Sequence, residues 1–504
     1  MLFACGREFP NAIQTRPGYI CVGAVLMTYY LFLVIPIVEW SIRIVMTLVI
    51  LRRGLAPVTA LAWLTAIFFL PLIGLPVYLL VGVSYLGRNR VRSHKLVAGR
   101  SLSRARLDLM KHHALRPEAG PEQQAMIAQA QRMSSNPILG GNTVELLPET
   151  IDYIDRLVQD IDAARHHVNL LYYIWRPDAL GRRVVDAVLR AQRRGVICRV
   201  LVDAVGSKTL LKSPWSQQMR QAGAEVRAML PVRLWRRKLA RMDLRNHRKI
   251  AVIDGRIAYA GSHNLVVEDY GHRRAGKWID LSSRLIGPIV AQLQIVFLED
   301  WEFESDERLE FLELFPSPRR VGEVAAQVVP TGPNHPSDSF QRVLLAALNS
   351  AQRKIIMTTP YLVLDEPTMV ALSMAANRGV EVLIVIPRRS DHPLVGAAGR
   401  AYFEQLMEAG VQIHRCHTGL LHAKTITIDD ALALLGSANL DIRSFYLNFE
   451  VNVLLYGPQI VGRLRFAQQN YLAQAEQLSL EAWRQRPAIH QYGESAAALL
   501  SPLL

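Results

Sequence analysis

Two copies of one short motif, H-x-K-x4-D, hold the residues of this chain that are best suited to chemistry. The copies lie 175 residues apart in the 504-residue sequence, in "NHRKIAVIDG" and "LHAKTITIDD". Their members are His247, Lys249 and Asp254, and then His422, Lys424 and Asp429. Because each copy offers one imidazole and one ammonium group, the repeat predicts a single composite site built from both halves of a duplicated fold.

The residue types favour a phosphate group as the target. Each motif leads into an apolar strand, "IAVID" or "TITID", whose period-2 alternation places histidine and lysine on one face. An ammonium group repels a metal ion but attracts phosphate. Imidazoles titrate near neutral pH, so one can attack phosphorus while the other acts as general acid and base. We therefore expect a ping-pong reaction through a phosphohistidine, without a metal or other cofactor.

A second repeated motif, G-S-x-N, follows each copy at the same offset. We expect its polar residues to bind the phosphate oxygens, together with the motif lysines, as charge develops in the transition state. These residues are Ser262, Asn264, Ser437 and Asn439.

Carboxylates are needed as well, because an attacking histidine has its tautomer fixed through its other ring nitrogen. Asp280 in "GKWIDL" and Glu450 in "LNFEVN" are the best candidates for orienting the histidines. Asp254 and Asp429 belong to the catalytic motif, although their positions at strand ends before a turn favour a structural role.

Composition limits the class of protein. The formal charge of +15, from 58 Lys+Arg against 43 Asp+Glu, favours a polyanionic partner, either nucleic acid or an anionic membrane. The four cysteines show no C-x-x-C spacing, so neither a disulfide framework nor a zinc ribbon is indicated. His414, Cys416 and His417 lie near His422, but their spacing suits no common zinc site.

The N-terminal region decides between the two polyanions. Residues 19–38 and 54–87 are uncharged runs of 20 and 34 residues, and about 20 apolar residues span a bilayer. We expect a membrane anchor over 1–87 with two segments, about 19–40 and 58–83. Pro71, Gly74 and Pro76 make the second either a kinked span or a re-entrant hairpin. Glu39 and Arg43, four residues apart on a helix, can neutralise one another.

Basic residues around these segments predict the orientation. With two spans, the N-terminus and the rest of the chain share one side, which the positive-inside rule makes the cytoplasm. The residues on that side are Arg7, Arg16, Arg88, Arg90, Arg92 and Lys95, whereas Arg52 and Arg53 occupy the connecting turn. The prediction is a multi-pass membrane protein with cytoplasmic catalytic lobes.

Downstream, apolar runs alternate with helical stretches, as in "HHVNLLYYIW" and "VICRVLVDAVG", and the order repeats in "RKIIMTTPYLV" and "VEVLIVIP". This is β-α-β syntax with buried parallel strands. We expect a basic connector at 88–137, a first lobe at 138–312, a Pro-rich linker at 313–338 and a second lobe at 339–504. Residues 233–245, a basic stretch around Trp235, are expected to bind anionic lipid, with a solvated helix face as the alternative.

Together these motifs resemble the phospholipase D superfamily and, within it, the bacterial cardiolipin synthases. The resemblance covers nearly the whole chain, through "YYIW", "DLRNHRK", "GSHN", "KWIDL", "TTPYLV", "GLLHAKT" and "GSANLDIRSFYLNFE". It implies an α/β fold with two pseudo-symmetric α-β-α sandwich lobes after a helical transmembrane region. It also implies transfer of a phosphatidyl group between two phosphatidylglycerol molecules, with His247 as nucleophile and His422 as general acid and base.

Three other functions remain open. A phospholipase D would pass the phosphatidyl group to water, and acceptor choice cannot be deduced from the loop sequences. A nuclease would also suit a charge of +15, but two membrane segments argue against a nucleic-acid partner. A non-catalytic scaffold for anionic lipids would not need intact pairs of histidine, lysine and asparagine.

Overall fold

The computed structural model describes residues 18–55, 57–82, 110, 112–117, 120–231, 244–271, 276–305, 307, 309, 314–332, 335 and 338–501. For residues 18–32, 58, 80 and 81 only the backbone is described. The predicted basic side chains at 88–95 and most of the basic stretch around Trp235 lie outside the described residues. The chain divides into two units, Met1–Ser84 and Tyr85–Leu504, and each is described separately.

The described part of the N-terminal unit consists of three helices, α1 (Gly18–Arg52), α2 (Pro57–Phe69) and α3 (Pro71–Val81). They pack on one another around Met46, Ile50, Ile67 and Tyr78. The pairing expected between Glu39 and Arg43 is confirmed, with Oε2 and Nη2 3.1 Å apart.

One helix of the described chain is long and apolar enough to cross a membrane, over Leu33–Arg52, with a mean hydropathy of 2.0. The second predicted segment, 58–83, is instead divided between α2 and α3. Pro71 causes the division, because proline has no N–H to continue α2 yet fits the first position of α3. The prediction of two spans is therefore corrected to one candidate span and a pair of short helices.

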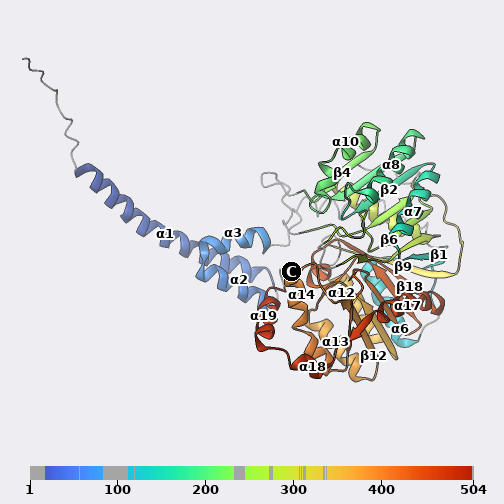
Figure 1. The fold of residues 1–504 in the computed structure, drawn as a ribbon. Helices are drawn as coiled ribbons and strands as arrows, with labels where there is room; N and C mark the ends of the chain where they lie inside the picture. Colours follow the sequence, from blue (N-terminus) through green and yellow to red (C-terminus); the bar gives the residue numbers. More distant parts are fainter. Residues whose placement is uncertain are drawn as a thin grey trace, which may run out of the picture. The chain divides into compact units, whose positions relative to one another are not determined.

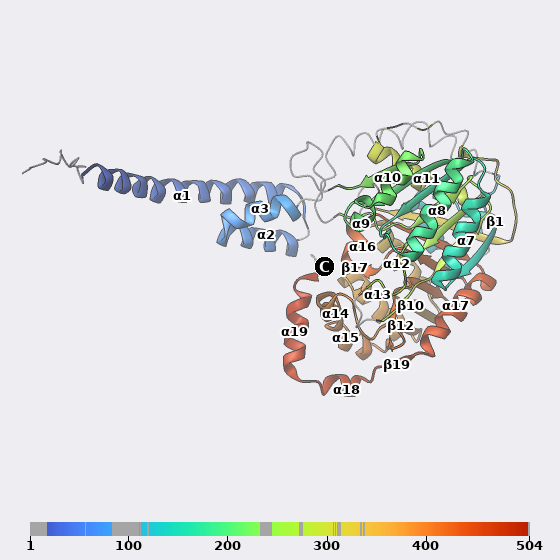
Figure 2. The same cartoon turned by 45° about the horizontal axis from the view of Figure 1, so that its top comes forward.

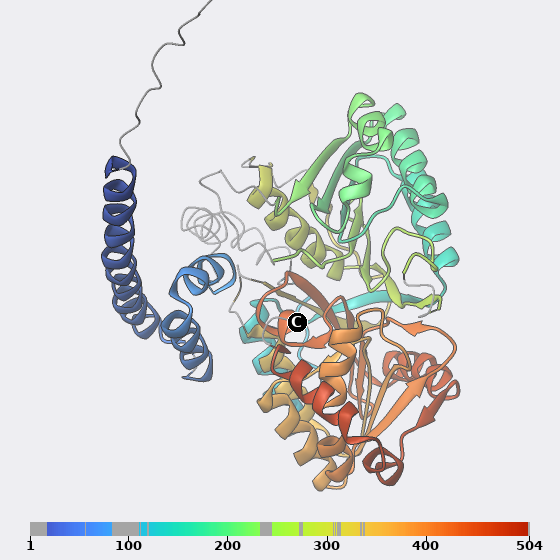
Figure 3. The ribbon, with the colours of Figure 1, turned by 60° about the vertical axis from the view of Figure 1, so that its left-hand side comes forward.

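The second unit is built on one sheet of 15 strands, in the order β19-β13-β12-β10-β15-β16-β18-β9-β1-β8-β6-β5-β2-β3-β4. Figure 1 shows this sheet with helices on both sides, and Figure 3 separates the green first lobe from the orange and red second lobe. The two lobes meet where β1 and β9 pair antiparallel.

The first-lobe strands are β1 (Leu139–Leu147), β2 (His167–Tyr172), β3 (Ile197–Asp203), β4 (Glu225–Met229), β5 (Ile250–Ile253), β6 (Ile257–Gly261), β7 (Trp278–Ile279) and β8 (Ser282–Ile286). Its helices are α7 (Thr150–Ala163), α8 (Ala179–Arg193), α9 (Lys208–Leu211), α10 (Pro214–Gln221) and α11 (Ile289–Ser305).

The second-lobe strands are β9 (Val324–Thr331), β10 (Lys354–Thr358), β11 (Leu362–Val363), β12 (Glu381–Pro387), β13 (Gln412–Cys416), β14 (Leu420–Leu421), β15 (Thr425–Ile428), β16 (Leu432–Gly436), β17 (Leu440–Asp441), β18 (Glu450–Tyr456) and β19 (Ala475–Gln477). Its helices are α12 (Ser339–Ser350), α13 (Glu366–Asn377), α14 (Pro393–Arg400), α15 (Phe403–Glu408), α16 (Ile442–Tyr446), α17 (Pro458–Leu472), α18 (Leu480–Arg484) and α19 (Ala488–Ala498).

The duplication extends through both lobes strand by strand. The order β4-β3-β2-β5-β6-β8-β1 in the first lobe matches β13-β12-β10-β15-β16-β18-β9 in the second. In each, three parallel strands are followed by antiparallel ones. Consequently β5 and β15, which follow the H-x-K motifs, begin at the edge where their parallel neighbours end.

The sheet is covered on both faces, as buried parallel strands require. Figure 2 shows α7 and α8 side by side on the first lobe, and α12 and α13 cover the same face of the second. The other face packs on α11 and α17. In α8 the buried residues Val184, Val185, Val188 and Ala191 recur at helical spacing, which explains why this face of the helix turns inward.

Two segments expected outside the lobes contribute to the core. Strand β9 lies within 313–338, the stretch interpreted as a linker, and is a central strand of the sheet. Helix α6 (Pro121–Ser134), within the predicted connector, packs on α12 through Met126 and Ala130. The proline and polar residues of these stretches are typical of linkers, so the sequence did not predict β9 or the packing of α6. Both elements pack on partners that are far away in the sequence.

Candidate active site

The first H-x-K segment pairs with the second lobe. Asn246 forms a parallel bridge with Phe449. The His247 backbone N–H donates to the Phe449 carbonyl at 2.9 Å, and the Phe449 N–H donates to the Arg245 carbonyl at 3.0 Å. Since Glu450 directly follows Phe449, this pairing sets Glu450 beside His247.

The second H-x-K segment pairs in the same way with the first lobe. Strand β14 pairs parallel with β7, so that Leu420 lies opposite Trp278. The His422 N–H then donates to the Ile279 carbonyl at 2.8 Å. Asp280 follows β7 as Glu450 follows Phe449, and it is set beside His422.

Two histidine–carboxylate contacts therefore cross between the lobes. His247 Nδ1 lies 3.1 Å from Glu450 Oε2 and 3.0 Å from the Ser437 carbonyl oxygen. His422 Nδ1 lies 2.6 Å from Asp280 Oδ1. An ionised carboxylate can only accept, so each Nδ1 carries the proton and each Nε2 keeps a lone pair. Both imidazoles thus have the tautomer that a nucleophile or general base requires.

The serines of G-S-x-N hold the carboxylates. Ser262 Oγ donates to Asp280 Oδ1 and Ser437 Oγ donates to Glu450 Oε2, both at 2.6 Å. Both serines are fully buried. Because each hydroxyl has one proton and has already donated it, the geometry assigns these serines to the carboxylates and not to the substrate phosphate, where the sequence had placed them.

The asparagines of the same motif keep donor capacity. Asn264 Nδ2 donates to the Tyr270 hydroxyl at 3.3 Å, and its Oδ1 accepts from the Ile174 N–H at 3.2 Å. Asn439 Nδ2 donates to Asp441 Oδ2 at 3.0 Å. Since an amide nitrogen has two protons, one N–H of each remains for a substrate oxygen.

The ammonium group of each motif lysine bonds to the backbone of the motif histidine. Lys249 Nζ donates to the His247 carbonyl and Lys424 Nζ to the His422 carbonyl, each at 2.6 Å. Burial lowers the pKa of Lys249 to about 8 and that of Lys424 to about 7, although nearby carboxylates oppose the shift. A bound phosphodiester anion would raise both pKa values again.

Burial also sets the charge of the catalytic pairs. It lowers the pKa of His422 to about 3 and lowers the pKa of His247, so both imidazoles are neutral at neutral pH. Burial alone would raise the pKa of Asp280, but the interaction with His422 brings it below its ordinary value. Glu450 behaves in the same way beside His247. Two neutral imidazoles therefore face ionised carboxylates.

The motif aspartates are not brought to this site. They end β5 and β15, roughly 20 Å along the strand from the histidines, in left-handed conformation with φ of 52° and 47°. Each carboxylate accepts three backbone N–H groups at 2.7–2.9 Å. The donors are Arg165, His166 and His167 for Asp254, and Gln352, Arg353 and Lys354 for Asp429. Their inclusion in the catalytic set is corrected, because they fasten strand ends.

Two aromatic residues, Tyr173 and Trp278, contact the histidines and were not predicted as site residues from the sequence. The Tyr173 ring lies 4.8 Å from the His247 ring and 5.3 Å from Lys249 Nζ. The Trp278 ring lies 4.3 Å from the His422 ring. These residues belong to "YYIW" and "KWIDL". In the sequence they look like ordinary aromatic residues of buried strands, and only the fold shows that they contact the imidazoles. Among the residues that the structure describes, no three His, Cys, Asp or Glu side chains are grouped to hold a metal ion.

Comparison with known proteins agrees with this geometry. Residues 157–301 and 344–469 match the family described as "Cardiolipin synthase, PLD-like domain". Cardiolipin synthase A of Yersinia pseudotuberculosis is 37% identical over 472 residues, which cover 92% of this chain and 97% of the relative. Cardiolipin synthase A of Erwinia tasmaniensis is 38% identical over the same shares. The chain belongs to the cardiolipin synthase family.

A solved structure supports the fold. A phosphatidylserine synthase of Haemophilus influenzae superposes with a TM-score of 0.58 at 15% identity, over 75% of this chain and all of that chain. Membership of the cardiolipin synthase family confirms the resemblance, and the two PLD-like regions confirm the predicted α/β fold with two related lobes.

Proposed function

We propose that this chain is a cardiolipin synthase. It transfers a phosphatidyl group from one phosphatidylglycerol to the headgroup of another, giving cardiolipin and glycerol. The observation that supports this most directly is the crossed pair His247–Glu450 and His422–Asp280, which leaves a lone pair on Nε2 of each histidine. Each motif lysine donates to the backbone carbonyl of its own histidine.

In the first half-reaction, His247 Nε2 attacks the phosphorus of the donor lipid. A P–N bond forms, and the bond from phosphorus to the glycerol headgroup oxygen breaks. His422, protonated when the anionic phosphodiester binds beside it, gives its proton to that oxygen, so free glycerol leaves. Glu450 stabilises the positive charge on the attacking imidazole.

In the second half-reaction, His422 takes the proton from a headgroup hydroxyl of a second phosphatidylglycerol. The resulting oxygen attacks phosphorus, the P–N bond breaks, and cardiolipin forms. Lys249, Lys424, Asn264 and Asn439 hold the non-bridging oxygens in both steps. His247 returns to its neutral form, and no proton is gained or lost overall.

The same proposal includes the location. Helix α1 would cross the inner membrane of a bacterium, with the catalytic lobes in the cytoplasm. Arg52 and Arg53, at the lobe side of the candidate span, are the residues that the positive-inside rule expects there. The partners are phosphatidylglycerol and other anionic lipids of that membrane.

The function is tested with the purified full chain and vesicles of phosphatidylglycerol. Cardiolipin and glycerol should appear in equal amounts, and His247→Ala and His422→Ala should abolish both, with thermal unfolding measured to confirm that each variant is folded. Phosphatidic acid without cardiolipin would mean that water is the acceptor. Full activity in either histidine variant would contradict the two-histidine mechanism.

The orientation is tested with an exposed cysteine at Ser495→Cys in intact spheroplasts. The experiment uses a Cys5→Ser/Cys21→Ser background, and the remaining native Cys198 and Cys416 are buried, so the new thiol should dominate labelling. A membrane-impermeant maleimide should label it only after the cells are opened. Labelling of intact cells would place the lobes outside.

A further inference from the structure

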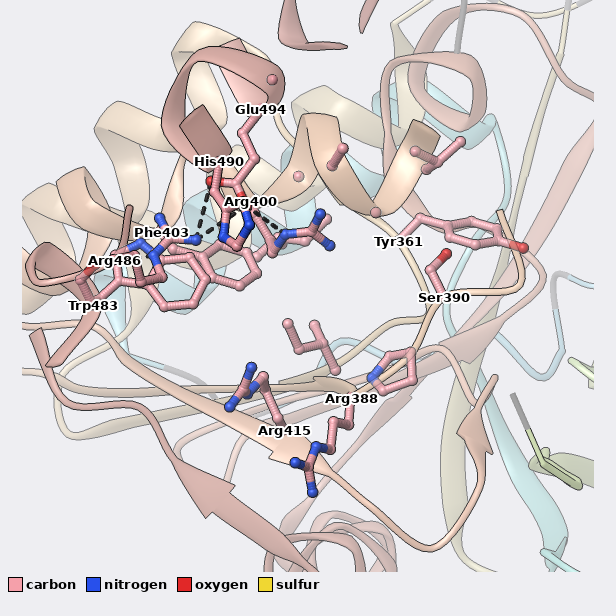
Figure 4. Close-up of a pocket in the computed structure, with 18 of the residues that line it drawn as sticks. Tyr361, Arg388, Ser390, Arg400, Phe403, Arg415, Trp483, Arg486, His490 and Glu494 are labelled. Atoms are coloured by element: carbon pink, nitrogen blue, oxygen red, sulfur yellow. Dashed lines mark hydrogen bonds and ion pairs between the residues drawn. The ribbon is translucent and has the colours of Figure 1, made fainter. Parts of the chain in front are cut away.

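The second lobe contains a cavity of about 600 Å³ next to the candidate active site. Figure 4 shows it between Arg388 and Arg415 on one side and Arg400 with α19 on the other. Its floor is formed where β10, β12 and β13 end, at Pro360, Pro387 and Arg415. In open α/β sheets the carboxyl ends of parallel strands are the usual place for a ligand.

This sheet edge is also the edge of His422 and Lys424. Thr425, the first residue of β15, pairs with Thr358 of β10, which pairs with Val385 of β12. Adjacent strands lie about 4.8 Å apart, so the cavity begins at β10, one strand from β15. Arg388 follows β12 and Arg415 lies in β13, about 10 and 14 Å from β15 along the sheet. Tyr361 forms the wall between the cavity and the catalytic segment, and its hydroxyl donates to Asp391 at 2.9 Å. The Asp391 charge in turn acts on Lys424.

The lining is cationic. Four arginines contribute to it, and Glu494 is the one acidic side chain among the described lining residues. Glu494 Oε1 is shared by Arg400, at 2.6 Å, and Arg486, at 3.0 Å. Arg415 pairs with Glu476, which is not part of the lining. The cavity therefore keeps a surplus of positive charge that an anionic group can neutralise.

Some donors in the cavity have no acceptor in the described part of the structure. Arg415 Nε and Trp483 Nε1 are buried atoms of this kind, and Trp483 itself is only 6% exposed. Arg388 has no side-chain ion pair or hydrogen bond among the described residues and is exposed, on the same side of the cavity as Arg415. The exposed guanidinium of Arg388, which has no acceptor among the described residues, is suited to phosphate oxygens.

The first lobe provides an internal comparison. Strand registers align Arg388 with Ala204 and Arg415 with Ala228, because β12 and β13 repeat β3 and β4. The fold is therefore built equally well with alanine at both positions. Arg415 also pairs with Glu476 of β19, a strand that has no counterpart beside β4 in the described sheet. Arg388 has no such partner among the described residues, and ligand binding is a physical reason for its charge at this position.

We propose that this cavity binds the phosphodiester of the acceptor phospholipid, with Arg388 and Arg415 as its principal contacts. The inference rests on the proposed function and adds a specificity site to it. When one phosphate is held at the two histidines, the acceptor's own phosphate lies one glycerol unit away, on the side of β10 and β12. Ile489, which lines the cavity and is 72% exposed, would contact the apolar part of the lipid.

The test separates two acceptors in one reaction. Vesicles of phosphatidylglycerol are incubated with isotopically labelled glycerol, and cardiolipin and labelled phosphatidylglycerol are both quantified. Cardiolipin needs an acceptor that carries a phosphate, whereas label exchange needs only glycerol. Arg388→Ala and Arg388→Ala/Arg415→Ala should lower cardiolipin formation about tenfold or more, with exchange retained, since each lost contact is a charge-assisted hydrogen bond. Arg388→Lys should restore part of the loss.

Arg342→Ala is the matched control, because it removes one exposed arginine of the same lobe outside the cavity. It should change neither product. Equal loss of both products in Arg388→Ala, or no loss of either, would overturn the acceptor site while leaving the synthase proposal intact. If the unaltered protein makes phosphatidic acid and exchanges glycerol but forms no cardiolipin, both proposals fail together.

Discussion

His422 Nδ1 and Asp280 Oδ1 lie 2.6 Å apart although 142 residues and a lobe boundary separate them. The reciprocal contact joins His247 to Glu450. Each lobe thus supplies the imidazole for one pair and the carboxylate for the other. Chemistry and the association of the lobes are consequently coupled.

Asp280→Asn should lower kcat by about 10³- to 10⁴-fold with little change in KM. The amide can donate to Nδ1 and so favours the wrong tautomer, an effect of about this size in the serine protease triad. Steady-state rates with phosphatidylglycerol vesicles measure it, and thermal unfolding checks that the variant is folded. A loss of less than tenfold would show that Asp280 does not control the tautomer.

Activity should fall at alkaline pH because the lysines lose their protons. Burial brings the pKa of Lys424 to about 7 and that of Lys249 to about 8, so free enzyme loses positive charge as pH rises through this range. The fall should appear in kcat/KM first and in kcat only at higher pH, because bound phosphate raises both pKa values. In Lys424→Arg, whose charge persists, the decline should move to higher pH. A profile that is flat to pH 10 would contradict this assignment.

Asp300→Ala should destabilise the protein by about 3–5 kcal/mol, because it leaves the buried Arg248 charge without its carboxylate. Both side chains are fully buried, and Arg248 Nη1 lies 2.6 Å from Asp300 Oδ1. Arg248 also donates to the carbonyls of Thr331 and Glu450, across the lobe interface. Denaturant unfolding in detergent measures the loss. The exposed pair of Arg183 and Asp155 is the control, and Arg183→Ala should cost less than about 1 kcal/mol.

Asp429→Ala should affect stability and not chemistry. It removes the acceptor of three backbone N–H groups, so a cost of about 1–3 kcal/mol is expected. The kcat of the folded fraction should remain unchanged, whereas His422→Ala should remove the activity of the folded fraction. A folded but inactive Asp429→Ala would return this aspartate to the catalytic set.

The lobes could be predicted because burial leaves a direct trace in the sequence. The run "HHVNLLYYIW" contains β2 and "VICRVLVDAVG" contains β3, whose covered faces select apolar residues at nearly every position. The two copies of the motif also predicted the number of lobes, and the copies occupy equivalent positions in the sheet.

The crossed pairing could not be predicted. Spacing within each half is equally compatible with Asp280 orienting His247, and only the pairing of β7 with β14 decides otherwise. The roles of Ser262 and Ser437 depend on the same contacts. The division of residues 58–83 was also uncertain, because hydropathy measures composition and does not locate the turn before Pro71.

The antiparallel pairing of β1 with β9 has a consequence for the origin of the chain. Reciprocal contacts of this kind are those of a twofold-symmetric dimer, in which each subunit gives the other what it receives. An ancestor with one lobe could have formed the same site only by meeting its own copy, with two identical histidines. Once the two copies were joined in one chain, their sequences could differ. The second half could then have arginines at positions 388 and 415, where the first half has alanines at positions 204 and 228. A fused chain can therefore have different binding sites for the donor and the acceptor lipid, whereas a symmetric dimer of identical chains cannot.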